Sequence, residues 1–69
     1  MENSNFKSIT EVTLRSFAKD GYTGFLRADG RLETYMDDDL VWTSYSVGES
    51  SVETEFIDAV NLVSGQLYA

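Results

Sequence analysis

Three adjacent aspartates, Asp37, Asp38 and Asp39, are the residues of this chain best suited to chemistry. Clustered carboxylates can bind a hard cation, or can divide general acid and base roles between them. The D-x-D-x-D-G spacing with a distal Glu that builds an EF-hand loop does not occur here. Catalysis by paired carboxylates also needs an enclosing pocket, for which a 69-residue domain has little volume. We therefore interpret the three aspartates as a solvated turn, and we predict no metal site and no cofactor.

Other residue types that carry enzymatic chemistry are missing or stand in the wrong context. The sequence contains no His and no Cys, so the commonest general base and the soft nucleophile are both absent. Its serines occur in no G-x-S-x-G motif. Without Cys there are neither disulfides nor zinc–thiolate sites, which is typical of a protein from a reducing cytoplasm. We predict that the chain is not an enzyme.

Acidic side chains dominate the second half of the chain. From Leu32 onward there are eight Asp or Glu residues and no Lys, Arg or His, which gives −8 against about +1 for the first 31 residues. The eight are Glu33, Asp37, Asp38, Asp39, Glu49, Glu53, Glu55 and Asp58. Such a field repels nucleic acid and anionic membranes and attracts basic protein surfaces. Solubility is the simpler explanation, but a solubilising surface normally mixes both signs of charge.

The elements that would position these carboxylates begin with an ambiguous segment, residues 9–19. A capping-box spacing that starts at Ser8, together with Gly21 as a terminating residue, favours a helix over 9–19. The β-branched residues and the alternation around Val12 and Leu14 favour a strand instead. We favour the helix and keep the strand as the alternative.

A hairpin is the clearest feature of the middle of the chain. Asp29-Gly30 is a turn signal between the apolar-containing runs 22–28 and 31–36. Because side chains alternate along a strand, only a loop with an odd number of residues leaves one apolar face. A loop at 28–30 and a loop at 29–31 both satisfy this condition. Either one buries Tyr22, Leu26, Leu32 and Met36, and leaves Phe25 and Tyr35 on the outer face.

A third strand is expected at residues 40–47, after a turn at the three aspartates. Either Trp42 or Tyr45 would lie on its outer face, and the alternation of the strand does not decide between them. The outer face would then hold an aromatic cluster that the rest of the chain is too short to cover. A protein interface or plain cross-strand packing would account for such a cluster. The surrounding negative charge argues against nucleic acid as its ligand.

The most regular helical pattern covers residues 52–64. Ser50 or Ser51 would cap its start, and Gly65 would end it. The apolar stripe that would face the sheet consists of Val52, Phe56, Ala59, Val60, Val63 and Leu67.

These elements predict one small acidic α+β domain spanning residues 1–69, with 1–5 frayed. The expected fold is a three-stranded antiparallel sheet flanked by an N-terminal and a C-terminal helix (α-β-β-β-α). The alternative is a four-stranded meander plus the C-terminal helix. No signal-peptide pattern opens the chain, and no apolar run approaches the roughly 18 residues of a membrane span. We therefore expect a soluble, cytoplasmic protein.

The layout resembles that of small acidic anti-CRISPR proteins encoded by phages, particularly some that block CRISPR nucleases. The likeness lies in the α-β-β-β-α order, in the acidic composition without Cys, and in Ser44–Val60 (SYSVGESSVETEFIDAV). In that segment a strand ending in serines leads through an acidic, Ser-rich connector into a helix with paired apolar residues.

The resemblance implies a non-enzymatic, DNA-mimicking inhibitor of phage or mobile-element origin that works in the bacterial host cytoplasm. It would bind a basic surface of a nucleic-acid-handling complex, such as a CRISPR effector, without touching nucleic acid or membrane itself. An anti-restriction protein would present the same acidic surface. The partner-binding residues would be Glu33, Asp37, Asp38, Asp39, Glu49, Glu55 and Asp58, with Tyr35, Trp42 and Tyr45 as apolar anchors.

A competing interpretation is a small acidic homodimer or adaptor module in protein–protein interaction. An adaptor would bind away from the nucleic-acid site of its partner and would leave that site free. Competition with nucleic acid therefore distinguishes the two.

Overall fold

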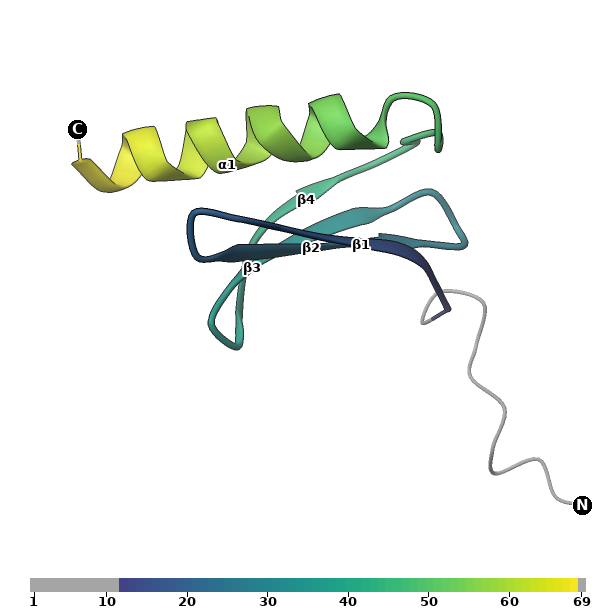
Figure 1. Cartoon of the computed structure of the whole chain (residues 1–69), viewed down its shortest axis with the longest axis horizontal. Coiled ribbons are helices and arrows are strands. Elements are labelled where there is room, and N and C mark those ends of the chain that lie inside the picture. Colours follow the sequence, from purple (N-terminus) through teal and green to yellow (C-terminus); the bar gives the residue numbers. More distant parts are fainter. Residues whose placement is uncertain (1–11, 69) are drawn as a thin grey trace, which may run out of the picture.

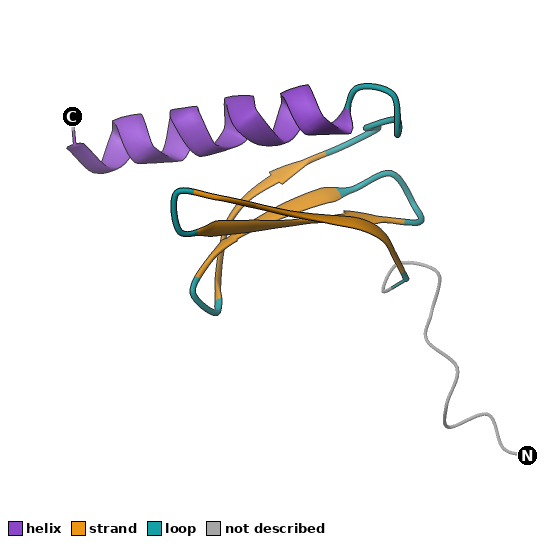
Figure 2. Ribbon diagram, in the orientation of Figure 1, coloured by secondary structure: helices purple, strands orange, loops and turns teal. Residues whose placement is uncertain are grey.

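The computed structural model describes residues 12–68, with side chains up to residue 65 (Figure 1). The described residues form four strands and one helix: β1 (Thr13–Lys19), β2 (Tyr22–Arg27), β3 (Leu32–Met36), β4 (Asp39–Ser44) and α1 (Val52–Tyr68). The strands make one antiparallel sheet in the order β1-β2-β3-β4. Figure 2 shows the helix lying along one face of this sheet. The predicted α+β class is confirmed, in its alternative form of a four-stranded meander plus a C-terminal helix.

The predicted helix over residues 9–19 is wrong from Thr13 onward, because that stretch is strand β1. Residues 9–11 lie outside the described residues. β1 pairs with β2 along its length, and this pairing supplies backbone hydrogen bonds that a helix would otherwise provide. An isolated helix of about 11 residues is marginal in water. Pairing with β2 therefore selects the strand, which is the alternative that the β-branched residues and the apolar–polar alternation favoured.

The turn between β1 and β2 contains the first of the two Asp-Gly pairs of the chain, Asp20-Gly21. Lys19 lies opposite Tyr22, so Asp20 and Gly21 form a two-residue hairpin loop. Their φ angles of 53° and 86° are both left-handed, as a tight hairpin requires. Gly21 was expected to end a helix, but it serves this turn instead.

The hairpin between β2 and β3 uses the loop at residues 28–30. Leu26 lies opposite Leu32, a register that excludes the alternative loop at 29–31. Gly30 has a φ of 92°, the left-handed conformation that closes a three-residue hairpin loop. The odd loop confirms the predicted face for Tyr22, Leu26 and Leu32. The predicted burial of Met36 is wrong, because this residue ends β3 beside the exposed aspartate turn and is 37% exposed.

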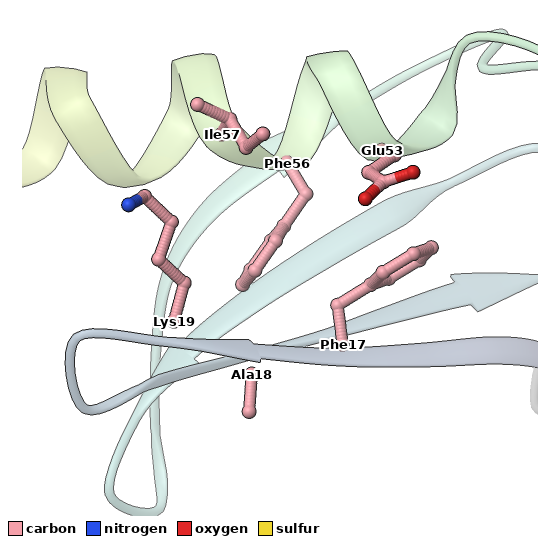
Figure 3. Close-up of a pocket in the computed structure, with 6 residues that line it drawn as sticks. All are labelled: Phe17, Ala18, Lys19, Glu53, Phe56 and Ile57. Carbon is pink, nitrogen blue, oxygen red and sulfur yellow. The ribbon is translucent and has the colours of Figure 1, made fainter.

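The two faces of the sheet differ in what covers them. On the face toward α1, Tyr22, Leu26 and Leu32 are buried against the helix. Figure 3 shows Phe17 and Lys19 of β1 pointing toward α1, and Ala18 pointing the opposite way. We call that opposite side the open face. By the strand register it carries Thr13, Ser16, Ala18, Thr23, Phe25, Arg27, Glu33, Tyr35, Leu40 and Thr43.

The helix buries the predicted stripe and runs past its predicted end. Ser51 precedes the first turn, and its carbonyl accepts a hydrogen bond from the Glu55 N–H at 3.0 Å. Gly65 has no left-handed φ, so it continues the helix, and the predicted end at residue 64 is wrong. The buried part of the stripe is Val52, Phe56, Ala59, Val60 and Val63. The side chain of Leu67 lies outside the described residues.

Thr34 is fully buried in this core, and its hydroxyl has no hydrogen-bond partner among the described residues. A buried hydroxyl without a partner loses its water without compensation, at a cost of about 1–3 kcal/mol. We expect Thr34→Val to stabilise the domain by about 1 kcal/mol, or about 4–8 °C in Tm for a domain of this size. Thermal unfolding followed by circular dichroism measures the shift. Thr23→Val on the open face is the control and should stay within about 0.5 kcal/mol; an equal gain there would contradict the explanation.

Candidate functional site: the acidic β4 edge

The three adjacent aspartates form the turn that leads into strand β4. Met36 lies opposite Asp39, so Asp37 and Asp38 are the two loop residues. All three aspartates are exposed. Asp37 has a φ of 56°, a left-handed conformation that Asp tolerates better than most residues. Figure 1 shows this turn projecting from the sheet on the side away from α1.

Strand β4 is one of the two edges of the sheet, and apolar side chains are exposed along it. Leu40 is 50% and Val41 36% exposed. Together with Trp42 and Thr43 they line an open hollow of about 330 Å³. Tyr45, which is 72% exposed, directly follows the end of the strand. We define the β4 edge as residues 39–45.

The predicted aromatic anchors do not share one face. Trp42 lies opposite Thr34 on the side of α1 and packs against the core. Tyr45 lies beyond the end of β4, so neither Trp42 nor Tyr45 joins the open face. The strand register shifts at Val41, a β-bulge that resets the alternation and puts Leu40 opposite Tyr35. Tyr35 packs edge-on against Phe25 on the open face, with ring centroids 5.6 Å apart.

The helix adds carboxylates on two flanks. Glu53 and Ile57 line a hollow of about 180 Å³ with Phe17 of β1 (Figure 3). Residues two positions apart on a helix point about 200° apart, so Glu55 lies on the other flank. Leu62, 44% exposed, shares that flank because it stands seven residues after Glu55. Asp58 is exposed between the flanks.

The exposed carboxylates carry an uncompensated charge. Three of the four described cations, Lys19, Arg27 and Arg31, form ion pairs with Asp20, Asp29 and Glu33, and the fourth, Arg15, lies over the Phe17 ring. Within residues 12–68, no cation pairs with the other acidic side chains. Those side chains are Asp37, Asp38, Asp39, Glu49, Glu53, Glu55 and Asp58, and all are exposed. Their negative field is therefore open to solvent.

Glu33 differs from the other predicted contact residues because it is enclosed. Its side chain is 9% exposed and lies 2.7 Å from Arg27 Nε and 2.7 Å from Arg31 Nη1. The Tyr35 hydroxyl donates to the same carboxylate at 3.5 Å. Both carboxylate oxygens of Glu33 are thus engaged inside the protein, and its charge is compensated by the two arginines.

Arg27 ties this cluster together. Its guanidinium lies 5.0 Å from the centre of the Phe25 ring and donates to the Thr13 hydroxyl. Burial alone would lower the pKa of Arg27, but the hydrogen bond and the charge of Glu33 outweigh it, so its pKa is raised. A raised pKa extends the pH range over which Arg27 is charged beyond that of an ordinary arginine. Arg27 therefore remains a cation at every pH used for ordinary measurements.

The structure thus gathers some predicted residues and separates others. Asp37, Asp38, Asp39, Trp42 and Tyr45 lie on or beside the β4 edge. Glu55 lies apart from it, exposed on the flank of α1 opposite Glu53. Glu49 lies in the connection between β4 and α1. Sequence reasoning did not name Leu40 and Val41 as contact residues. Their signal was an apolar pair directly after an acidic turn, which alone does not show that β4 is an edge.

Known proteins give no independent indication of the chemistry. Comparison with protein-family models, curated protein sequences and solved structures finds no match to this chain. Across residues 12–68, no three acidic side chains gather in a way that could hold a metal ion. The same stretch includes no helix with the length and apolar character to cross a membrane. The function must therefore be argued from the β4 edge and its charge.

Proposed function

We propose that this protein is a non-enzymatic binding protein that docks its acidic side against a basic surface of a nucleic-acid-handling protein. The observation that carries the proposal is the set of seven exposed carboxylates without an ion pair among the described residues. By occupying a groove that normally holds nucleic acid, the protein would inhibit its partner. This is the mode of action that the anti-CRISPR resemblance implies. Of the grounds for that resemblance, the acidic composition without Cys and the segment Ser44–Val60 remain, whereas the α-β-β-β-α order is not the order of the described elements.

The physical basis is long-range attraction followed by short-range packing. With a net charge of −7, the chain attracts a basic groove over a Debye length of about 8–10 Å. Attraction of this kind raises the association rate and makes it sensitive to salt. Exposed Leu40, Val41 and Tyr45 lie among the carboxylates and supply the apolar contact that charge alone does not give.

The proposal predicts a capture that depends on salt and competes with DNA. A tagged chain is incubated with bacterial lysate at about 100 mM and about 500 mM salt, and captured proteins are identified by mass spectrometry. We expect a DNA-binding protein whose recovery falls about tenfold at the higher salt. Added duplex DNA should displace it. A captured partner that is indifferent to both salt and DNA would contradict the inhibitor and favour an adaptor.

Two matched variants test whether the location of the charge matters. Asp37 and Asp20 occupy the first position of two-residue hairpin loops, with φ angles of 56° and 53°. Asn tolerates this conformation, so Asp37→Asn and Asp20→Asn each remove one charge without a new strain. We expect Asp37→Asn to weaken the captured complex about threefold to tenfold, and Asp20→Asn to leave it unchanged. Equal effects would show that only the net charge matters.

A further inference from the structure

The two edges of the sheet are protected to different degrees. An edge strand presents unpaired N–H and C=O groups, which proteins guard with bulges, Lys or Pro. Both edges carry a bulge, Leu14 in β1 and Val41 in β4. β1 adds the cations Arg15 and Lys19, whereas β4 (DLVWTS) has no cation and no Pro. Among the described residues, no strand pairs with the outer side of β4.

We propose that β4 accepts an extended Lys- or Arg-bearing segment of the partner protein as a fifth strand. The inference takes the basic character of the partner from the proposed function. It adds how the partner would be recognised, by pairing with β4. Main-chain hydrogen bonds to an edge strand provide affinity, and hollows for alternate side chains provide specificity. The hollow lined by Leu40, Val41, Trp42 and Thr43 runs along the strand that would receive the segment.

Charge complementarity identifies the occupant as basic. Asp37, Asp38 and Asp39 lie at the start of the strand, and Glu55 is exposed on the flank of α1 opposite Glu53. Alternate side chains of an added strand point to one face, so Lys or Arg at every second position would line up on the side away from α1, toward which the aspartate turn projects. A second copy of this chain is the poorer occupant. Pairing two β4 edges would bring together two proteins that each carry −7.

The test uses a defined probe, a fluorescent peptide in which Lys and Val alternate. Its length of about eight residues is within the usual range for a strand. The control peptide has the same sequence with N-methyl groups on alternate backbone nitrogens. These groups remove hydrogen-bond donors and keep the charge of the peptide. We expect the first peptide to bind at least about tenfold more tightly, since strand addition requires these donors. Hydrogen exchange should also show new protection of β4 amides and none in β1.

Two variants at the bulges are matched controls for each other. Val41→Lys guards the β4 edge with a cation, and Leu14→Lys adds the same charge to the β1 edge. Both side chains are exposed, 36% and 47% respectively. We expect Val41→Lys to abolish binding of the peptide and Leu14→Lys to leave it within about twofold. Should Val41→Lys fail to fold by circular dichroism, Leu40→Lys at a 50% exposed position replaces it.

Failure of this inference is separable from failure of the proposed function. Equal binding of both peptides, or no gain of β4 protection, would show attraction by charge alone and would overturn strand addition. Binding of neither peptide, or unchanged binding by Val41→Lys, would overturn it as well. In each case the DNA-competed capture from lysate still decides the proposed function, because that assay does not depend on backbone pairing.

Discussion

Gly24→Val is expected to destabilise the domain more than any other single substitution proposed for it. A Cβ at this position would lie 2.5 Å from Phe56 Cδ1 and 2.6 Å from Cε1, well inside van der Waals contact. The Phe56 ring cannot move aside, because it is 2% exposed and stacks on Phe17 with ring centroids 5.6 Å apart. Phe17 is itself the cross-strand neighbour of Gly24. The missing side chain of Gly24 thus creates the space in which the helix meets the sheet.

The size of the effect follows from the size of the domain. Overpacking a core costs about 1–3 kcal/mol, and more when the neighbours are fixed, so about 3 kcal/mol or more is expected for Val. A domain of this length has a total stability of about 3–10 kcal/mol. Urea denaturation followed by circular dichroism measures the loss, and Gly24→Ala should show a smaller one. Gly48→Ala is the control, since a Cβ there meets nothing within 4 Å.

A double mutant distinguishes this steric explanation from a loss of sheet propensity. Phe56→Leu removes ring atoms that collide with the new Cβ. Gly24→Ala should therefore cost less in the Phe56→Leu protein than in the wild type. If the two losses simply add, the contact between Gly24 and Phe56 is not the reason for the glycine.

The second large effect is expected from Glu33→Ala, which should destabilise the domain by about 2 kcal/mol. The substitution leaves Arg27 and Arg31 facing each other without the carboxylate that lies 2.7 Å from both. Breaking a deeply buried ion pair costs about 3–5 kcal/mol. The lower figure applies here because the arginine side chains are 19% and 28% exposed, so water screens part of the loss.

Chemical denaturation of Glu33→Ala, Glu33→Gln and Glu55→Ala measures this contribution. Gln keeps a hydrogen-bond acceptor without the charge, so its loss should be intermediate. Glu55 is exposed and has no ion pair with a described residue, so Glu55→Ala should stay within about 0.5 kcal/mol. A stability loss of Glu33→Ala no larger than that of Glu55→Ala would show that the pair contributes nothing. Glu33 variants also need a stability correction before any binding defect is assigned to them.

The two Asp-Gly pairs show what local sequence can and cannot predict about a turn. Asp29-Gly30 was interpreted correctly because apolar runs flank it, and the alternation of those runs restricted the loop to an odd number of residues. Asp20-Gly21 has the same composition and is also a hairpin loop. It was interpreted as a helix end because the preceding residues also fit a capped helix. Only the pairing of residues 13–19 with β2 decides that Asp20-Gly21 is a hairpin loop and not a helix end.

Some properties of the candidate site could likewise be predicted from the sequence, and others could not. The sequence alone determined the single-signed charge after Leu32, the buried face of the β2–β3 hairpin except at Met36, and the buried part of the α1 stripe, because these depend on residue type and spacing. The tertiary structure alone decided that Glu33 is enclosed by Arg27 and Arg31 while the other carboxylates stay exposed. It also decided that β4 is an edge and that Trp42 turns inward at the Val41 bulge. These properties depend on which elements become neighbours in the folded chain. Packing of the whole domain determines those neighbours, so a local sequence pattern cannot predict them.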